Sequence, residues 1–227
     1  MIREIIFKPH FLRFAYRTLR WHLRYSLGQN PLPLVCGFYI TSKCNFRCHF
    51  CNIWRMSPGF QISEEEARRL IKELGKMGLI YFSFSGGEPL LVPYCFDLLA
   101  YAKKCGILYT HIVSNGYLMD VARAKKLAEA HVSEISFSLD GDEKVHDQNR
   151  GMKGAFNKVI EVIDHVKTHA PKTEIVLNTI LNPIQPENAI FALNLAKRLG
   201  VKIKVQPIND HPSFGANEPA LKQRRSL

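Results

Sequence analysis

The sequence predicts an α/β fold built on one parallel sheet. Strand-like and helix-like stretches alternate six times between residues 34 and 206. Polar motifs also follow the strands at the same end each time. Consecutive parallel strands need a right-handed helical crossover, so units of this kind in series favour a parallel sheet covered by helices.

Short apolar stretches bounded by turn residues supply the strands. We expect strands over residues 34–41, 81–85, 109–114, 134–139, 174–179 and 202–206. The helix after the first strand starts at Ser63, which forms a capping box with Glu66. Four further helices are expected over residues 92–104, 120–130, 155–168 and 186–199.

Polar residues follow each predicted strand. In chain order they occupy residues 44–51, 85–89, 114–116, 138–141, 178–179 and 206–207. β/α barrels build their active sites at the carboxyl ends of their strands, whereas turn residues without a function would mark both ends equally. We therefore expect one functional site at this edge of the sheet.

The chain has 227 residues, enough for one full-sized core, and a formal net charge of +11. No apolar run reaches the roughly 18 to 20 residues that cross a bilayer. We divide it into an N-terminal helix and linker (1–30), a main domain (31–210) and a polar tail (211–227). The tail offers no convincing sixth helix, so either the chain is a fragment or the tail caps the barrel.

Residues 10–27 are predicted to form a basic amphipathic helix. Arg13, Arg17, Arg20 and Arg24 follow 4-3-4 spacing and form one stripe, beside a broad apolar and aromatic surface. Such a helix suits an anionic lipid interface. The favoured alternative is a helix packed across the barrel with its arginines in water. Nucleic acid is the less favoured third partner.

Three of the six cysteines lie within eight residues. Cys44, Cys48 and Cys51 have the spacing C-x3-C-x2-C. Three thiolates on a cubane cluster would leave one iron open to a small molecule, whereas structural zinc is usually closed by four ligands. A zinc site completed by His49 or a distant residue, and three buried structural cysteines, stay open as alternatives. A disulfide framework is disfavoured because the chain shows no secretory signal.

With Phe50 just before its last cysteine, this loop resembles the cluster loop of the radical S-adenosylmethionine (radical SAM) enzymes. The resemblance implies an open (β/α)6 partial TIM barrel over about residues 34–210. It also implies a [4Fe-4S] cluster on Cys44, Cys48 and Cys51, with S-adenosylmethionine chelating the fourth iron. One electron from the reduced cluster would release methionine and a 5′-deoxyadenosyl radical. Phe50 is then expected to stack near the adenine.

The motif Gly86-Gly87-Glu88-Pro89 resembles the GGEP motif of the same family. In this comparison the glycines let the backbone approach a ligand closely, and Glu88 supplies a negative charge for the methionine ammonium. A Gly-Gly turn followed by Glu could by itself simply start a helix. Its position one strand after the cysteine loop supports the resemblance.

Two further pairs are expected to contact S-adenosylmethionine. Ser114 and Asn115 could bind its ribose or methionine part, although Ser-Asn-Gly is also an ordinary turn. Ser138 and Asp140 alternate at the end of the fourth strand and so face one side, into the barrel. A buried carboxylate needs a partner, and ribose hydroxyls would serve.

The pattern His146-Asp147-x-x-Arg150 resembles one that follows the fourth strand in relatives. It would let Arg150 grip the methionine carboxylate in a bidentate fork, while His146 and Asp147 order the loop. A solvated loop is the alternative. Asn178 and Gln206 are expected either to touch adenine or ribose, or to satisfy backbone groups inside the barrel.

We therefore expect an enzyme that abstracts hydrogen from, or adds to, an unidentified substrate. The N-terminal helix favours a lipid or isoprenoid, as in the hopanoid-adenosylating branch of the family. Peptide or RNA modification is the second reading, and a zinc- or cluster-binding nucleic-acid module is the non-enzyme alternative. An external one-electron donor such as flavodoxin or ferredoxin is implied. The expected location is the cytoplasm, with membrane attachment through residues 10–27 left open.

Overall fold

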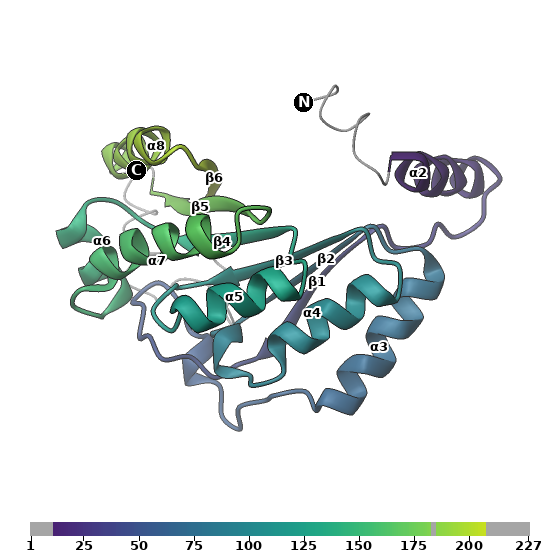
Figure 1. The fold of residues 1–227 in the computed structure, drawn as a ribbon, viewed down its shortest axis with the longest axis horizontal. Coiled ribbons are helices and arrows are strands. Elements are labelled where there is room, and N and C mark those ends of the chain that lie inside the picture. Colours follow the sequence, from purple (N-terminus) through teal and green to yellow (C-terminus); the bar gives the residue numbers. More distant parts are fainter. Residues whose placement is uncertain (1–10, 183–184, 208–227) are drawn as a thin grey trace.

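The computed structural model describes residues 11–182 and 185–207. All strands are parallel and form one sheet in sequence order, from β1 to β6 (Figure 1). Their bounds are β1 Val35–Thr41, β2 Tyr81–Gly86, β3 Tyr109–Ser114, β4 Glu134–Ser138, β5 Glu174–Leu181 and β6 Lys202–Pro207. The expected α/β class with six parallel strands in one open sheet is confirmed.

Helices follow the strands and cover one face of the sheet, where α3, α4, α5 and α7 lie in a row (Figure 1). The helices of the main domain are α3 Glu64–Met77, α4 Cys95–Lys104, α5 Val121–Glu129, α6 Glu143–Arg150, α7 Ala155–His169 and α8 Pro186–Leu199. Helix α4 starts three residues later than expected because residues 92–94 form a turn that follows the 3-10 turn η2 (Pro89–Leu91). Helix α6 was not expected from the sequence. Its first turn is capped by Asp142, which accepts a hydrogen bond from the Val145 amide at 2.9 Å.

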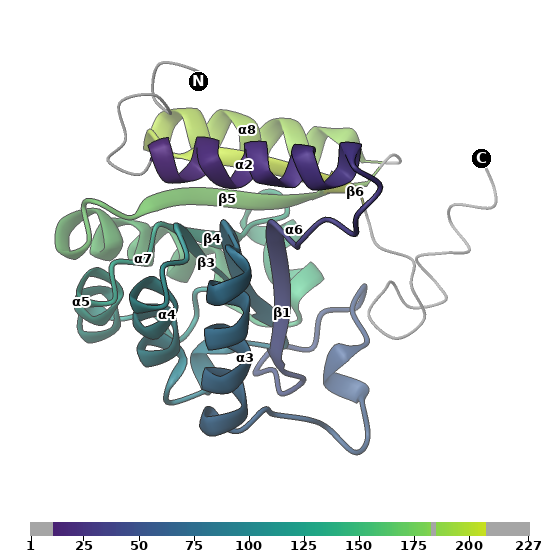
Figure 2. The ribbon, with the colours of Figure 1, turned by 90° about the vertical axis from the view of Figure 1, so that its right-hand side faces the viewer.

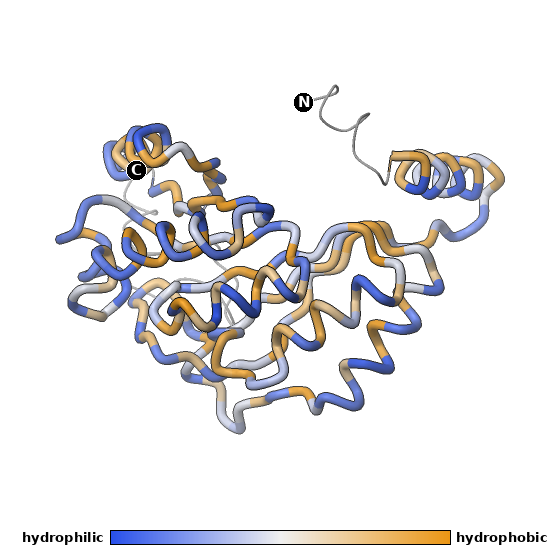
Figure 3. The backbone as a smooth tube through the Cα atoms, viewed as in Figure 1, coloured by the Kyte–Doolittle hydropathy of each residue, from blue (hydrophilic) through white to orange (hydrophobic). Residues whose placement is uncertain are grey.

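The hydrophobic core lies between the sheet and these helices. Phe82, Ile112, Phe137 and Leu177 come from four neighbouring strands and are fully buried there. Figure 3 shows the strands as largely hydrophobic, whereas hydrophilic and hydrophobic residues alternate along the helices. Because side chains alternate along a strand, the opposite face of the sheet receives the other residues, which are mainly polar.

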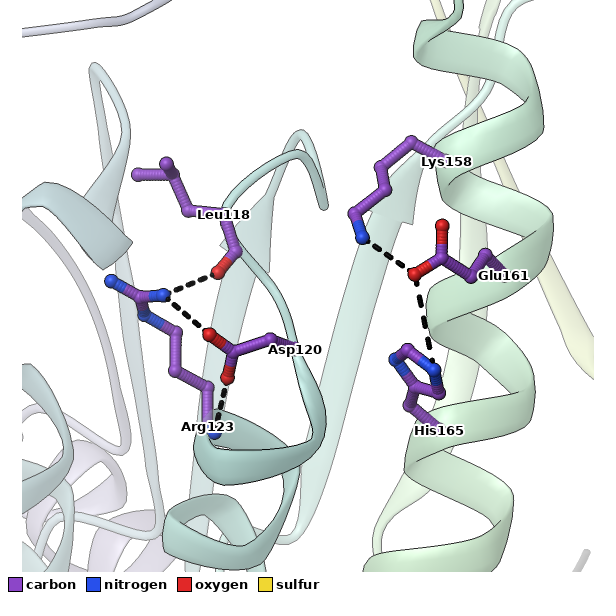
Figure 4. A network of polar contacts seen from close by, with 6 residues as sticks. All are labelled: Leu118, Asp120, Arg123, Lys158, Glu161 and His165. Atoms are coloured by element: carbon purple, nitrogen blue, oxygen red, sulfur yellow. Dashed lines mark hydrogen bonds and ion pairs between the residues drawn. The ribbon is translucent and has the colours of Figure 1, made fainter.

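The outer helices are held by local polar contacts (Figure 4). Asp120 caps α5 by accepting a hydrogen bond from the Arg123 amide at 2.7 Å. On α7, Glu161 contacts Lys158 at 2.7 Å and His165 at 3.8 Å. A cap of this kind is worth about 1 kcal/mol, whereas exposed ion pairs contribute little. The Asp120 cap fixes the start of α5, whereas the contacts of Glu161 lie within α7.

The face of the sheet opposite the helices contains a buried histidine. The Nδ1 atom of His111 lies 2.7 Å from Ser83 Oγ, and its Nε2 atom lies 2.8 Å from Ser136 Oγ. Nε2 is also 3.3 Å from a carboxylate oxygen of Glu134. Burial, and secondarily the charge of Lys204, lowers the pKa of His111 to about 4. The inner face is therefore a polar layer with a neutral imidazole.

The N-terminal helix α2 (Phe11–Ser26) lies across the end of the sheet where β1 begins (Figures 1 and 2). Arg17 Nη1 donates to the carbonyl of Leu79 at 2.8 Å, and Arg24 Nε donates to the carbonyl of Asn30 at 3.2 Å. The predicted arginine stripe is thus divided, because two of its members bind the protein's own backbone.

The other side of α2 is apolar and exposed. Its large side chains recur every three or four residues, at Leu12, Tyr16, Leu19 and Leu23. Each is more than half exposed, and Arg13 and Arg20 are exposed as well. None of the described helices combines the length and hydrophobicity needed to cross a bilayer. The predicted tail, residues 211–227, lies outside the described residues.

Candidate active site

The polar residues that follow the first four strands meet at the carboxyl edge of the sheet. The side-chain amide of Asn115, after β3, donates to Asn45 Oδ1, after β1, at 2.8 Å. Arg150, after β4, approaches the sulfur of Cys48 at 4.0 Å. These contacts join segments that are 70 and 102 residues apart in sequence. The structure therefore brings the predicted motifs into one site.

The three loop cysteines are free thiols packed against apolar side chains. Cys48 is buried, and Cys44 and Cys51 are partly buried. Burial raises the pKa of Cys44 to about 12 and also raises that of Cys48, where the charge of Arg150 acts in the opposite direction. Thiolates at these positions need a positive partner, which a bound metal group supplies.

The glycines of the GGEP motif pack against the cysteine loop. Gly87 N donates to the carbonyl of Thr41 at 2.7 Å, and Glu88 N donates to that of Lys43 at 2.8 Å. A Cβ atom on Gly87 would lie 2.0 Å from Lys43 O, and one on Gly86 would lie 2.4 Å from Thr41 O. Any larger residue would therefore push the cysteine loop away. The sequence predicts only the approach of a ligand for these glycines, so their packing against the cysteine loop is a further role.

Glu88 is buried beneath the site and is already hydrogen-bonded within the chain. Its carboxylate accepts hydrogen bonds from Ser114 Oγ at 2.9 Å, Asn115 N at 2.8 Å and Leu90 N at 3.0 Å. Burial raises its pKa, and these three donors oppose that shift. Pro89 follows as the buried first residue of η2. A carboxylate offers about four acceptor positions, so three of them are already taken.

Asp140 and Arg150 form a buried bidentate ion pair. Arg150 Nε donates to Asp140 Oδ2 at 2.6 Å, and Nη2 donates to Oδ1 at 2.8 Å. The guanidinium carbon also lies 5.1 Å from the centroid of the Phe50 ring. The partner of the buried carboxylate is thus Arg150, where the sequence argument had suggested ribose. The fork that had been expected to hold a methionine carboxylate faces Asp140 in this structure.

His146 and Asp147 hold the segment around this pair. His146 Nδ1 accepts a hydrogen bond from the Asp140 amide at 3.2 Å. Burial, followed by the charge of Arg150, lowers the pKa of His146 to about 4. Asp147 accepts hydrogen bonds from the amides of Gly154 and Phe156, ahead of and within α7. Both residues thus order the chain around α6, in keeping with the expectation.

The remaining predicted residues lie on β4, β5 and β6. Ser138 and Asn178 are register neighbours on β4 and β5, and the buried Oδ1 atom of Asn178 has no hydrogen-bond partner among the described residues. Buried amide oxygens are nearly always hydrogen-bonded, so this atom is suited to a polar ligand. Gln206 lies on the edge strand β6, where it is the register neighbour of Ile180 on β5.

Sequence reasoning missed Asn45 as a site residue. Its side chain receives the hydrogen bond of Asn115 Nδ2, while Asn115 Oδ1 accepts from the Tyr117 amide at 3.0 Å. The side-chain amide of Asn115 is therefore used to tie two loops together. No local pattern could have shown this, because the contact spans 70 residues.

The donor set fits an iron–sulfur cluster better than a zinc ion. Structural zinc needs four ligands about 2.0–2.3 Å from one centre. Among the described residues, no three His, Cys, Asp or Glu side chains are arranged to hold a single ion. A cubane cluster instead binds each thiolate on a different iron. Cys44, Cys48 and Cys51 would hold it, with Arg150 as the nearby positive charge.

Comparison with known proteins points the same way. The model of the Radical SAM superfamily matches residues 38–196, more than half of the chain. Fe-coproporphyrin III synthase of Methanosarcina barkeri is 32% identical over 173 residues, covering 75% of this chain and 42% of that protein. An AdoMet-dependent heme synthase of the same organism is 30% identical over 177 residues, covering 77% and 50%. The chain thus spans about half the length of these relatives.

Solved structures share the fold at lower identity. Streptococcus suis SuiB bound to S-adenosylmethionine superposes with a TM-score of 0.70 at 15% identity, covering 96% of this chain and 52% of SuiB. The protein anSMEcpe with bound AdoMet gives 0.66 at 20% identity, covering 80% and 55%. With the family match and the cysteine loop beside the GGEP turn, these likenesses lead to one conclusion. The chain belongs to the radical SAM superfamily, whose members use a [4Fe-4S] cluster and S-adenosylmethionine.

Proposed function

We propose that this protein binds a [4Fe-4S] cluster through Cys44, Cys48 and Cys51 and cleaves S-adenosylmethionine reductively. The observation that carries the proposal is the position of three free thiols in one loop, held by the GGEP turn at the carboxyl edge of the sheet. When bound and reduced, the cluster supplies one electron to the sulfonium, which yields methionine and a 5′-deoxyadenosyl radical for hydrogen abstraction or addition.

The chain's own residues would orient the two cofactors. Gly87 and Glu88 fix the cysteine loop through their amides, and Arg150 places a positive charge beside Cys48. For the methionine part, we assign the ammonium to the remaining acceptor position of Glu88. We assign the carboxylate to Arg150, whose Nη1 atom makes no contact with Asp140.

The rest of the cofactor would lie along the strand ends. We assign the ribose to Ser138 and to the unpartnered oxygen of Asn178, and the adenine to Phe50 and Gln206. The ring of Phe50 adjoins the Arg150 guanidinium, whose carbon lies 5.1 Å from the ring centroid.

Anaerobic reconstitution tests this function. The protein should become brown with about four iron and four sulfide per chain. With dithionite and S-adenosylmethionine it should form 5′-deoxyadenosine and methionine, both measured by chromatography with mass detection. Cys48→Ala should lose both properties. Replacing the cysteines outside the loop with Ser should keep the iron content, which makes them the matched controls: Cys36, Cys95 and Cys105. A colourless protein that holds zinc instead would contradict the proposal.

The substrate we propose first is a lipid or isoprenoid, in keeping with a hopanoid-adenosylating relationship. Support comes from the exposed apolar side of α2, which would bring the protein to a lipid phase. A peptide or a porphyrin is the second candidate, favoured by the names of relatives, which include a PqqA peptide cyclase of Rhodopseudomonas palustris. The consumption of S-adenosylmethionine is measured with each compound class and with buffer alone. The class that increases this consumption above the buffer value is the favoured substrate.

Two further partners belong to this proposal. An external one-electron donor of the flavodoxin or ferredoxin type would reduce the cluster. A cytoplasmic protein attached to the membrane surface through α2 would account for its exposed leucines between exposed arginines. The arginines available for that contact are Arg13 and Arg20, since Arg17 and Arg24 bind backbone carbonyls.

A further inference from the structure

We propose that the basic rim of the cysteine loop is the docking surface for an acidic one-electron carrier protein. The basic rim consists of four exposed side chains: Lys43, Arg47, Arg55 and Lys153. The inference rests on the proposed function, because only a protein that holds a redox cluster needs such a donor. It adds the place where the donor binds and the residues that recognise it.

The rim carries positive charge without compensation. Between residues 42 and 62 the sequence has three Lys or Arg residues and no Asp or Glu. Lys153 follows two residues after Gly151, where an added Cβ atom would lie 3.0 Å from the carbonyl oxygen of Arg47, so its segment adjoins the cysteine loop. Among the described residues, no carboxylate forms an ion pair with any of the four cations. Uncompensated basic side chains attract acidic partners and speed their association.

An aromatic ring holds two of these cations in place. The guanidinium carbons of Arg47 and Arg55 lie 5.0 Å and 4.6 Å from the centroid of the Trp54 ring. Arg47 Nη1 also donates to the carbonyls of Cys44 and Phe46, at 2.7 Å and 2.9 Å. Pre-ordered arginines lose less side-chain entropy when a partner binds. Trp and Arg are also the residues that most often dominate the binding energy of protein interfaces.

The same ring is connected directly to the cysteine loop. Trp54 lies in the 3-10 turn η1 (Ile53–Arg55), and its Nε1 atom donates to the carbonyl of Cys48 at 3.5 Å. A partner that contacts Arg47 and Arg55 beside this ring would thus lie next to the backbone of Cys48. In the step itself the reduced carrier loses one electron and the cluster gains it, with no bond made or broken.

The rim suits a brief encounter better than a permanent complex. Redox partners typically bury less than about 1,200 Å² and dissociate quickly, which a few charged and aromatic residues can support. Nucleic acid would also be attracted by these charges, so the experiment includes an arm for it.

The test uses cluster-loaded protein under anaerobic conditions at matched iron content. Stopped-flow absorbance follows cluster reduction by reduced flavodoxin and, separately, by dithionite, which needs no docking surface. The variant is Lys43→Gln with Arg55→Gln, which leaves the backbone contacts of Arg47 intact. We expect the second-order rate constant with flavodoxin to fall about tenfold at low salt and to depend less on sodium chloride, while the rate with dithionite, a small anion, falls much less.

A control variant removes the same charge elsewhere. Lys197→Gln with Arg198→Gln lies in the last turn of α8, at exposed positions outside the rim. It should keep the flavodoxin rate. An equal loss in both variants would mean that net charge alone acts, and an unchanged rate in the rim variant would mean that the donor binds elsewhere; either overturns the proposal.

Two other outcomes also decide the question. If the rim substitutions abolish binding of an RNA oligonucleotide and spare the flavodoxin rate, the rim is a nucleic-acid surface and the proposal is overturned. If dithionite cannot reduce the wild-type protein, the proposed function fails and the docking surface falls with it. If dithionite reduces the protein but the rim substitutions do not slow reduction by flavodoxin, only the docking surface is overturned and the proposed function stands.

Discussion

At the residue scale, the buried pair of Asp140 and Arg150 connects the parts of the site. Asp140 follows β4, Arg150 ends α6, and the guanidinium reaches toward Cys48 in the loop after β1. Both side chains are buried, at 3% and 8% exposure. Taking charges out of water is costly, and the pair is tolerated because two short hydrogen bonds join it.

Breaking this pair should therefore destabilise the protein strongly. Asp140→Asn leaves the buried guanidinium without its counter-charge, and we expect a loss of about 3–5 kcal/mol in the free energy of unfolding. Urea unfolding of the metal-free protein measures this without any cofactor. The combined variant Asp140→Leu with Arg150→Met should lose less, since no charge is left unpaired.

The matched control for this experiment is the exposed pair of Glu73 and Lys76, which are also in contact. Glu73→Gln should cause no measurable change in stability. If Asp140→Asn is as mild as Glu73→Gln, the buried pair does not have the strength that we assign to it.

At the element scale, the turn after β2 determines where the cysteine loop lies. The amides of Gly87 and Glu88 bind the carbonyls of Thr41 and Lys43, immediately before Cys44. The missing side chain of Gly87 allows this approach. The cysteines are therefore placed by a neighbouring strand as well as by their own loop.

Gly87→Ala should displace the cysteine loop. The new Cβ atom would lie 2.0 Å from Lys43 O, a distance that backbone atoms cannot accept without moving. We expect a loss of about 1–3 kcal/mol in stability and a marked fall in iron bound after reconstitution. Gly37→Ala is the control, because a Cβ atom there meets nothing within 4 Å. Full iron content in Gly87→Ala would show that the loop tolerates the shift.

Helix α2 presents a separate element-scale question. It contacts the main domain through Arg17, while Leu12, Leu19 and Leu23 face outward. An exposed apolar stripe of this size is uncommon on a soluble surface and suggests a contact with another phase or molecule. The packing alternative placed all four arginines in water, whereas Arg17 binds the carbonyl of Leu79 and Arg13 and Arg20 are exposed.

We expect the wild type to co-sediment with phosphatidylserine vesicles at low salt. The double variant Leu12→Ser with Leu19→Ser should not co-sediment with them. Arg13→Gln with Arg20→Gln should weaken this binding about thirtyfold, since each basic residue near an anionic surface contributes roughly one kilocalorie per mole. Neutral phosphatidylcholine vesicles are the control. A wild type that stays in the supernatant with both lipids would leave α2 as a structural cap.

At the scale of the whole molecule, the sheet separates two different environments. One face packs against helices through a continuous apolar core, and the other holds the polar layer around His111. A neutral buried histidine makes stability depend on pH, because the unfolded chain binds its proton more readily than the folded one.

We expect the free energy of unfolding to fall as the pH is lowered below about 6.5. His111 is protonated near pH 6.5 in the unfolded chain, whereas its folded pKa is lowered to about 4. Its contribution is thus complete above pH 6.5 and lost as the pH falls toward 4, by up to about 3 kcal/mol. His111→Gln should make the profile of urea unfolding against pH less steep and leave the part due to His146, whose pKa is also lowered to about 4. His22→Gln on α2 should leave the slope unchanged. Parallel profiles for all three proteins would contradict this account.

Much of the fold could be predicted because it depends on local patterns. Alternating strand-like and helix-like stretches predicted six parallel strands, and the strand bounds agree within about two residues. Helix α6 was missed because its sequence, Glu143–Arg150, is almost wholly polar and has no apolar period. Its stability comes from the Asp142 cap and from packing on α7, which a pattern search does not detect.

The sequence by itself determined the family, the parallel sheet and the edge at which the site lies, because cysteine spacing and strand periodicity are local properties of the chain. Only the tertiary structure decided that Asp140 and Arg150 pair with each other, that Glu88 holds the Ser114–Asn115 turn, and which side of α2 is exposed. These are contacts between segments far apart in sequence. Which donor meets which acceptor depends on how the strands and helices pack, and a one-dimensional pattern does not contain that information.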